Sequence, residues 1–132
     1  MSPTPRGFPR SARLLKRSSF ENVYKNGRRH FGTHMTVFYR LDPSVAGARV
    51  GLTVGRVLGT AVVRNRIKRR MRDVVRHELE TLTQTLAGTG IEIVINPKKS
   101  AATIEIQALR NELAKAFQAI GAKAGKGESD KR

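Results

Sequence analysis

The segment AVVRNRIKRRMRD, residues 61–73, decides how the rest of the chain is interpreted. It holds six basic side chains and one asparagine in thirteen positions, yet its apolar residues keep the spacing of a helix. With about 100° of rotation per residue, four apolar residues share one side, as in a helix that packs against a core. These four residues are Val63, Ile67, Met71 and Val74. The segment therefore predicts a long helix with Thr60 as its N-cap, which ends near Leu82 or Leu86.

The charged residues of this helix are expected to form two adjacent rows beside the apolar stripe. The first row is Arg64, Lys68 and Arg72, the second is Asn65, Arg69 and Arg76, and Arg66 and Arg70 point to the other side. Like charges four residues apart destabilise an isolated helix by a few tenths of a kcal/mol per pair. A solvated helix face normally mixes signs, whereas Asp73 is the single acid beside these rows. The rows therefore predict a surface that binds phosphates, and a merely solvated face is the alternative.

The composition of the whole chain indicates the same kind of partner. Lys and Arg total 26 against 10 acids, which gives a net charge of +16. Such self-repulsion usually reflects a polyanionic partner, and the 17 arginines against 9 lysines suit bidentate contacts with phosphates. The sequence has no cysteine, and no apolar run approaches the ~18 residues of a membrane span. We therefore expect a soluble, cytoplasmic domain that binds nucleic acid.

The sequence on either side of the basic helix predicts one α+β domain. The expected elements, in order, are a helix over 19–25, a short edge strand in GRRHF (27–31), strands over 34–41 and 48–55, the basic helix, a strand over 91–96 and a closing helix that stops at Gly121. This order, α-β-β-β-α-β-α, predicts a two-layer sandwich with a four-stranded sheet and helices on one face. Residues 1–10 are predicted to be a flexible basic arm, 11–121 the domain, and 122–132 a disordered tail.

Local signals refine two of these elements. Ser18 and Glu21 have the spacing of a capping box, and Asn26 with Gly27 predicts a left-handed stop for the first helix. In the strand over 48–55, alternate residues leave one face nearly bare, so that another element could lie flat on it. This bare face consists of Gly51, Thr53 and Gly55.

The slightly longer segment GTAVVRNRIKRRMRD, residues 59–73, resembles the signature of the bacterial ribonuclease P protein component. The matching residues are Gly59, Ala61, Val62, Arg64, Asn65, Lys68, Arg69 and Arg72. The resemblance extends over about residues 11–120 of the chain. The sequence departs from the family at Gly55, Arg56 and Val57, where a lysine-rich turn is usual, and at Thr60 and Asp73, where Asn and Glu are common.

The resemblance implies a small basic cofactor of a catalytic RNA. The family's fold is an α/β sandwich that carries the basic helix on a left-handed crossover, against the general rule of handedness. Protein and RNA together form the endonuclease that removes the 5′ leader from precursor tRNA. Hydrolysis is expected from Mg²⁺ bound to the RNA subunit, and no cofactor is expected in the protein itself. The implied contacts with the catalytic RNA are Arg64, Asn65, Arg66, Lys68, Arg69 and Arg72.

The resemblance also implies that a cleft between the sheet and the first helix binds the single-stranded leader. Phe20 and Tyr24 are four residues apart and share one face of the predicted helix, where aromatic rings can stack on bases. The residues alone leave open which face of the strand over 34–41 is buried. The resemblance favours Val37 and Tyr39 on the leader side, with Phe38 in the core. The alternative for Phe20 and Tyr24 is that both are core residues.

Two other functions remain open from the sequence. A ribosomal protein or RNA chaperone also combines a sheet with a basic helix, and a DNA-binding protein places such a helix in the major groove. The DNA-binding function is disfavoured, because the basic helix runs directly between strands and has no helix-turn-helix partner. No catalytic residue or metal ligand is expected in the protein. The segment HELET (77–81) lacks the second histidine of a zinc-protease helix, and the carboxylates are scattered.

Overall fold

The computed structural model describes residues 13–14, 16–42, 44, 47–86 and 90–125, and it has the predicted α+β class and element order. The arm predicted over 1–10 and the tail from 126 onward lie outside the described residues. The helices and strands are α1 (Arg17–Asn26), β1 (Arg28–Phe31), β2 (Met35–Leu41), β3 (Ala48–Leu52), α2 (Ala61–Leu86), β4 (Ile91–Pro97) and α3 (Ile106–Gly125). Two short 3-10 helices, η2 (Arg56–Leu58) and η3 (Lys99–Ala102), precede α2 and α3.

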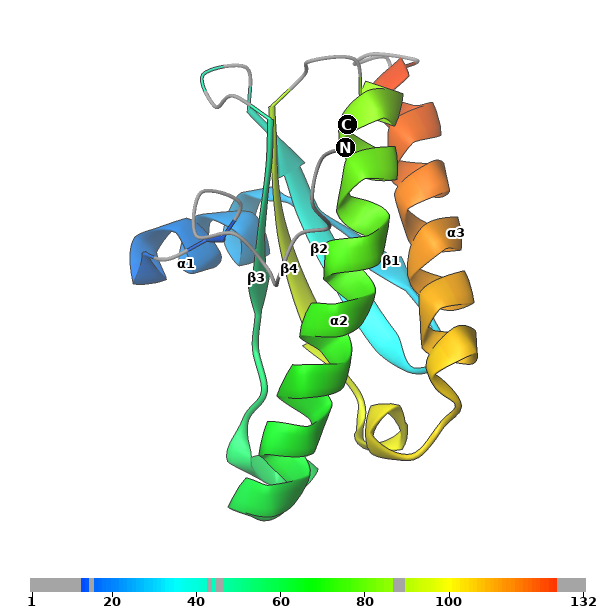
Figure 1. Ribbon diagram of the computed structural model, residues 1–132. Helices are drawn as coiled ribbons and strands as arrows, with labels where there is room; N and C mark the ends of the chain where they lie inside the picture. Colours follow the sequence, from blue (N-terminus) through cyan, green and yellow to red (C-terminus); the bar gives the residue numbers. More distant parts are fainter. Residues whose placement is uncertain (1–12, 15, 43, 45–46, 87–89, 126–132) are drawn as a thin grey trace, which may run out of the picture.

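The four strands form one sheet in the order β1-β2-β4-β3 (Figure 1). β1 pairs antiparallel with β2, and β2 pairs antiparallel with β4. β3 pairs parallel with β4, and α2 is the connection between these two strands. The last strand in sequence therefore lies between β2 and β3, which are neighbours in the chain but do not pair.

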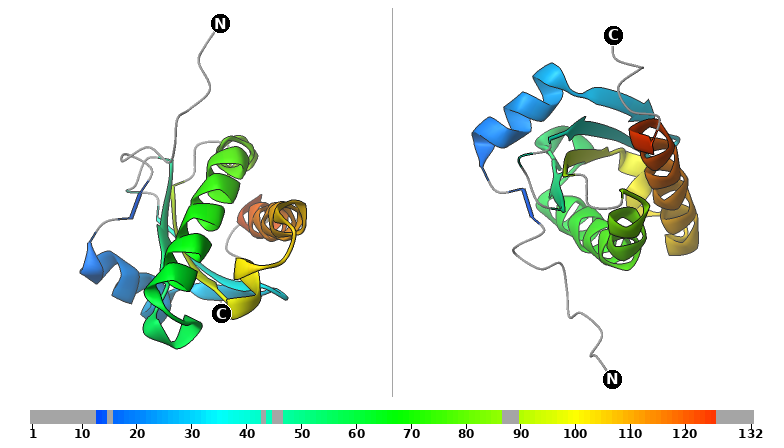
Figure 2. Two further views of the ribbon diagram at one scale, coloured as in Figure 1. Left: turned by 60° about the horizontal axis from the view of Figure 1, so that its bottom comes forward. Right: turned by 90° about the horizontal axis from the view of Figure 1, so that it is seen from above.

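The helices lie on both faces of the sheet (Figures 1 and 2). α2 and α3 cover one face, which we call the inner face, and enclose the main apolar core there. α1 packs on the opposite, outer face, where a smaller cluster is formed by Leu14, Val23 and Val94 with the partly buried Phe20 and Phe38. The expectation of helices on one face therefore holds for α2 and α3, whereas α1 adds a partial third layer.

The side chains of β2 face the opposite way from the prediction. Val37 and Tyr39 are buried in the main core, with Tyr39 only 3% exposed, and Phe38 faces α1. The prediction that Val37 and Tyr39 lie on the side of the first helix is therefore wrong. The outer face of β2 holds the polar Thr36 and Arg40 beside Phe38, so alternation fits the observed orientation, whereas the resemblance favours the other one. The register decides, because Val37 and Tyr39 pair with Ile95 and Ile93, whose side chains lie beneath the two long helices.

α1 packs on β2 and β4, and its Phe20 reaches the bare face of β3 at Gly51. The ring of Phe20 occupies the space that a Cβ on Gly51 would need. The ring of Tyr24 meets Phe38 edge to face, with 4.9 Å between the centroids. The small residue in the strand thus permits the close approach of an aromatic ring from the helix.

The caps of α1 differ from the prediction at both ends. The helix begins after Lys16, and no side chain caps it, so Ser18 does not form the predicted capping box. Gly27 has an extended backbone, with φ −94°, instead of a left-handed one. Its small size matters for another reason, because a Cβ there would lie 2.5 Å from the carbonyl oxygens of Val23 and Tyr39.

α3 ends later than predicted. Four residues of its apolar stripe are buried, but Ile106 in its first turn is 37% exposed. Gly121 lies within the helix, which continues to Gly125. Residues 122–125, predicted as part of the disordered tail, are therefore helical. The buried residues of the stripe are Leu109, Leu113, Phe117 and Ile120.

Glu112 of α3 holds the turn between β1 and β2. Its carboxylate accepts hydrogen bonds from the backbone amide of His34, at 2.9 and 3.1 Å, and from that of Met35, at 3.1 Å. A Cβ on Gly32 would collide with the same carboxylate. This acid is therefore engaged in joining the last helix to the first hairpin.

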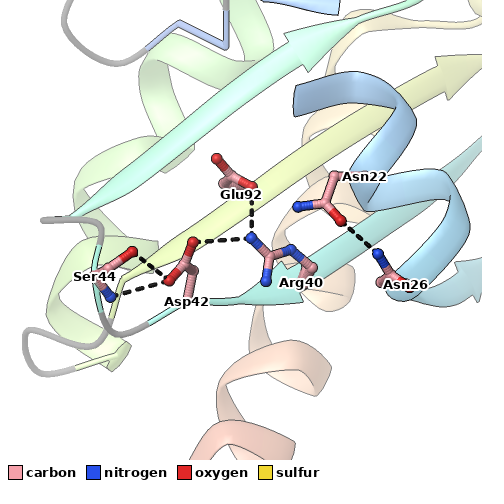
Figure 3. A network of polar contacts seen from close by, with 6 residues as sticks. All are labelled: Asn22, Asn26, Arg40, Asp42, Ser44 and Glu92. Atoms are coloured by element: carbon pink, nitrogen blue, oxygen red, sulfur yellow. Dashed lines mark hydrogen bonds and ion pairs between the residues drawn. The ribbon is translucent and has the colours of Figure 1, made fainter. Parts of the chain in front are cut away.

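A polar network lies on the outer face, at the end of β2 that leads into residue 42 (Figure 3). Arg40 donates to Asp42 at 2.8 Å and to the buried Glu92 at 3.4 Å. The Ser44 hydroxyl and amide both donate to Asp42, and these bonds, with a smaller contribution from Arg40, hold the pKa of its carboxyl below the usual value. The charge of Arg40 is thus balanced within the protein.

The contact of Phe20 with Gly51 of β3 gives a first test. We expect Gly51→Val to lower the free energy of unfolding by about 1–3 kcal/mol, because the new side chain displaces the ring of Phe20. Urea denaturation measures this change. Gly55→Ala is the matched control, since a Cβ there meets no atom within 4 Å among the described residues, and its effect should stay within about 0.5 kcal/mol. Equal losses in both variants would contradict this packing.

Candidate nucleic-acid interface

The start of α2 is fixed by a glycine and a threonine. Gly59 has a φ angle of 136°, a backbone conformation that residues with a side chain rarely adopt. The predicted N-cap is confirmed, because the Thr60 hydroxyl accepts a hydrogen bond from the amide of Val63 at 3.4 Å. Arg64 then reaches back and donates from Nε to the carbonyl oxygen of Gly59 at 3.2 Å. These contacts set where the first basic turns of the helix point.

The predicted apolar stripe of α2 is confirmed and orients the helix. Ile67, Met71 and Val74 are completely buried in the main core, and Val63 packs against it. The remaining surface of the helix therefore faces away from the sheet. Asn65, Arg69 and Arg72 are exposed there, and Arg64 and Lys68 are half-buried beside the stripe.

Four polar side chains on this surface have no hydrogen-bond or ion-pair partner within the described part of the chain. They are Asn65, Lys68, Arg69 and Arg72. Arg76, at the end of the second row, differs because it pairs with Asp73. The surplus positive charge of α2 is thus concentrated between residues 64 and 72, where no acid of the described residues pairs with it.

Arg66 and Arg70 point to the other side, as predicted, and support the fold. Arg66 donates from Nε to the carbonyl oxygen of Ala102 at 2.7 Å. Arg70 donates from Nε to Ala101 at 3.0 Å and from its terminal nitrogen to the carbonyl oxygen of Ile104. Together they hold the segment of η3 against α2. Arg66, predicted as an RNA contact, therefore already has a structural partner, although its side chain stays exposed.

The predicted aromatic pair on α1 has two different environments. Phe20 is partly buried in the cluster between α1 and the sheet, as the alternative interpretation expected of a core residue. Tyr24 is 38% exposed, and its hydroxyl lies 2.8 Å from the Thr53 hydroxyl and donates to the Asn96 side-chain oxygen at 2.9 Å. Tyr24 thus presents part of its surface to solvent while its hydroxyl is fixed.

Asn96 is a residue of this face that the sequence did not single out. It follows the buried run of β4 and pairs with Thr36 of β2 on the outer face. Thr53 lies beside it, since its amide donates to the carbonyl oxygen of Ile95 at 3.0 Å. Nothing in the local sequence relates Asn96 to Tyr24, because that contact depends on the packing of α1 against β4.

The basic helix and the polar row of Tyr24, Thr53 and Asn96 meet at one end of the sheet. β3 runs toward this end and leads through η2 into the first turn of α2. Lys98 lies at the same end, where its amide donates to the carbonyl oxygen of His34 at 2.8 Å. The opposite end of the outer face holds the ion pairs of Arg40. The end near the first turn of α2 therefore has the uncompensated positive charge that phosphates require.

Two other kinds of site are not seen in the described ranges. No group of three histidines or carboxylates comes together there to hold a metal ion. No helix among these residues is both long enough and apolar enough to cross a membrane.

Comparisons with known proteins agree with this geometry. The family described as Ribonuclease P matches residues 8–121. The ribonuclease P protein component of Geobacter sp. (strain M21) is 35% identical over 114 residues, which are 86% of this chain and 92% of that protein. That of Bacillus velezensis is 34% identical over 107 residues, 80% of this chain and 86% of the relative.

Solved structures share the fold. The ribonuclease P protein of Staphylococcus aureus, at 22% identity, superposes with a TM-score of 0.69 over 83% of this chain and 94% of its own. The protein from Thermotoga maritima, at 24% identity, gives a TM-score of 0.66 over 81% of this chain and 96% of its own. The arrangement of three helices around a four-stranded sheet is therefore that of these proteins.

Neighbouring arginines of α2 should differ in what they stabilise. We expect Arg70→Ala to lower the free energy of unfolding by about 1–3 kcal/mol, because it leaves the carbonyl groups of Ala101 and Ile104 without their donor. Arg69→Ala is the matched control and should change stability by less than about 0.5 kcal/mol, since its guanidinium has no partner within the described residues. Urea denaturation of both variants measures the difference. A larger loss for Arg69→Ala would reverse the assignment.

Proposed function

Because the chain belongs to the ribonuclease P protein family, we propose that it is the protein subunit of the ribonucleoprotein that removes the 5′ leader from precursor tRNA. The observation that carries this proposal is the set of unpaired polar side chains on α2. A folded protein seldom leaves several cations of one helix without any acid, because their repulsion opposes folding. A bound polyanion removes this repulsion.

The catalytic RNA is the partner that we assign to α2. The side chains free to contact it are Asn65, Lys68, Arg69 and Arg72. Arg64 lies beside them, and the exposed Arg66 could join them although it is bonded to Ala102 of η3. Arginine suits this role, because its planar guanidinium forms two parallel hydrogen bonds to one phosphate. Asn65 can both donate and accept, which allows a contact with a base edge or a 2′-hydroxyl.

The single-stranded leader of precursor tRNA is the partner that we assign to the outer face. Tyr24 offers a partly exposed ring, and Thr53 and Asn96 offer polar groups beside it. Phe20 supports this face from within the cluster of α1. Val37 and Tyr39 have no part in the proposal, because both are buried on the inner face.

We assign the hydrolysis itself to the RNA subunit and its Mg²⁺. In support, the half-buried Glu112 and the buried Glu92 are engaged in the fold, the first by backbone amides and the second by Arg40. The protein binds, screens phosphate charge and orients the leader. We place this activity in the cytoplasm, where bacterial tRNA precursors are made.

The decisive experiment identifies the RNA that the chain binds in cells. Sequencing of RNA recovered with the tagged protein should return one abundant catalytic RNA together with tRNA precursors. The reconstituted complex should cleave precursor tRNA at the 5′ end of the mature sequence, and the protein alone should cleave nothing. Recovery of ribosomal RNA or of varied messenger RNA, without cleavage by the complex, would instead support a ribosomal protein or an RNA chaperone.

The salt dependence of RNA binding tests the role of α2. The logarithm of the affinity should fall with the logarithm of the salt concentration, by about 0.7–0.9 for each phosphate contacted. Arg69→Ala should weaken binding of the catalytic RNA by about 1–3 kcal/mol and reduce the slope by about one contact. Filter binding at several salt concentrations measures both quantities. A slope near zero for the unaltered protein would contradict an electrostatic interface.

The preference for precursor over mature tRNA tests the role of Tyr24. In the reconstituted complex, Tyr24→Ala should reduce this preference by about 1–3 kcal/mol, because one stacking surface for a leader base is lost. Tyr24→Phe keeps the ring and loses only the hydrogen bonds to Thr53 and Asn96, so most of the preference should remain. Circular dichroism confirms that each variant folds. A Tyr24→Ala complex that keeps the full preference would show that the leader binds elsewhere.

A further inference from the structure

Phe31 on the edge strand β1 is a large apolar side chain left in water. It is 68% exposed, and the guanidinium carbon of Arg29 lies 5.3 Å from the centroid of its ring. Both residues come from the four-residue strand that borders the sheet. An exposed aromatic ring with a cation over one of its faces is a combination that single-stranded nucleic acids bind, since a base can stack on the ring and the cation can contact a phosphate.

The register of the sheet places Phe31 on the outer face, in line with the polar row. Phe31 pairs with Thr36, and Thr36 pairs with Asn96. Residues that pair directly across strands point to the same face, so the ring shares the face of Tyr24 and Asn96. Neighbouring strands are about 4.8 Å apart, which puts β1 about 10 Å from β4. The sequence could not relate these positions, because they meet only through the pairing of three strands.

We propose that Phe31 and Arg29 form a further nucleotide-binding position for the single-stranded leader, beyond the one at Tyr24. This inference rests on the proposed function of the outer face. The leader RNA crosses the polar row of Tyr24, Thr53 and Asn96 from β4 toward β1. A nucleotide farther from the cleavage site then stacks on the ring of Phe31. Arg29 contacts the adjacent phosphate. A leader that is too short does not reach this position.

The charge of β1 favours RNA over a second copy of the chain. An exposed edge strand is a common site of pairing between chains. Two copies joined through the four residues of β1 would bring the two arginines of each copy, Arg28 and Arg29, close to those of the other, and like charges near one another are destabilising. A single-stranded polyanion meets no such repulsion. A duplex fits less well, because its bases are already stacked on one another.

The test is the affinity of reconstituted complexes for precursor tRNAs with leaders of increasing length. Phe31→Ala should weaken binding of long-leader precursors about tenfold and leave short-leader precursors and mature tRNA unchanged. Phe31→Trp keeps a stacking surface and should bind long leaders as the unaltered protein does, whereas Phe31→Leu keeps only apolar bulk and should behave as Phe31→Ala. Ile106→Ala removes a partly exposed apolar side chain from α3 and is the matched control, without effect at any length.

Three results would overturn the inference. The inference requires Phe31→Leu to bind long leaders as weakly as Phe31→Ala does, so full affinity in the leucine variant would exclude stacking as the cause. An equal loss for short and long leaders would place the effect elsewhere. Self-association of the unaltered protein that Phe31→Ala abolishes, with leader affinity unchanged, would make β1 an interface between copies. If the complex still prefers precursor over mature tRNA in all these cases, the proposed function stands. If the unaltered complex shows no such preference, the assignment of the leader to the outer face is refuted.

Discussion

The burial of one apolar stripe holds the whole basic surface in place. Ile67, Met71 and Val74 are completely buried in the main core, and they fix α2 against the repulsion of its own cations. Each fully buried side chain of this size contributes about 1.5–3 kcal/mol, whereas each pair of like charges costs a few tenths. Burial therefore outweighs repulsion, and a rigid helix can present charges that would unfold an isolated peptide. The two sets of residues alternate along one segment, so their separation depends on helical geometry alone.

The arginines of α2 divide by the side of the helix on which they lie. Arg69 and Arg72 are exposed to solvent, whereas Arg66 and Arg70 bind carbonyl groups of the segment that leads to α3. The outer face shows a similar division between its ends. The charge of Arg40 is balanced by Asp42 and Glu92 at one end. The positive charges at the other end, near the first turn of α2, have no such acid partners among the described residues. The position and the partner of each charged residue thus describe the protein better than its net charge does.

Periodicity and motif predicted most of the fold, and pairing supplied the rest. The span of α2, its N-cap and its buried stripe follow from residues close in sequence, and all three are confirmed. The predicted orientation of β2 is wrong, because it rests on the resemblance, whereas Thr36 and Arg40 mark the outer face and the register with β4 buries Tyr39 beneath the helices. The predicted capping box failed because α1 begins at Arg17, one residue before Ser18. Asn96 could not be found in advance, since its contact with Tyr24 spans 72 residues.

The strand order imposes a sequence of events on folding. β4 lies between β2 and β3, yet it follows both of them and the whole of α2 in the chain. The hairpin of β1 and β2 can form early from local contacts, but β3 has no strand to pair with until β4 arrives. During synthesis on the ribosome, the edge of β2 therefore stays open until residue 97 has emerged. Completion of this one strand joins both halves of the sheet, and a chain that stops short of it has no closed core.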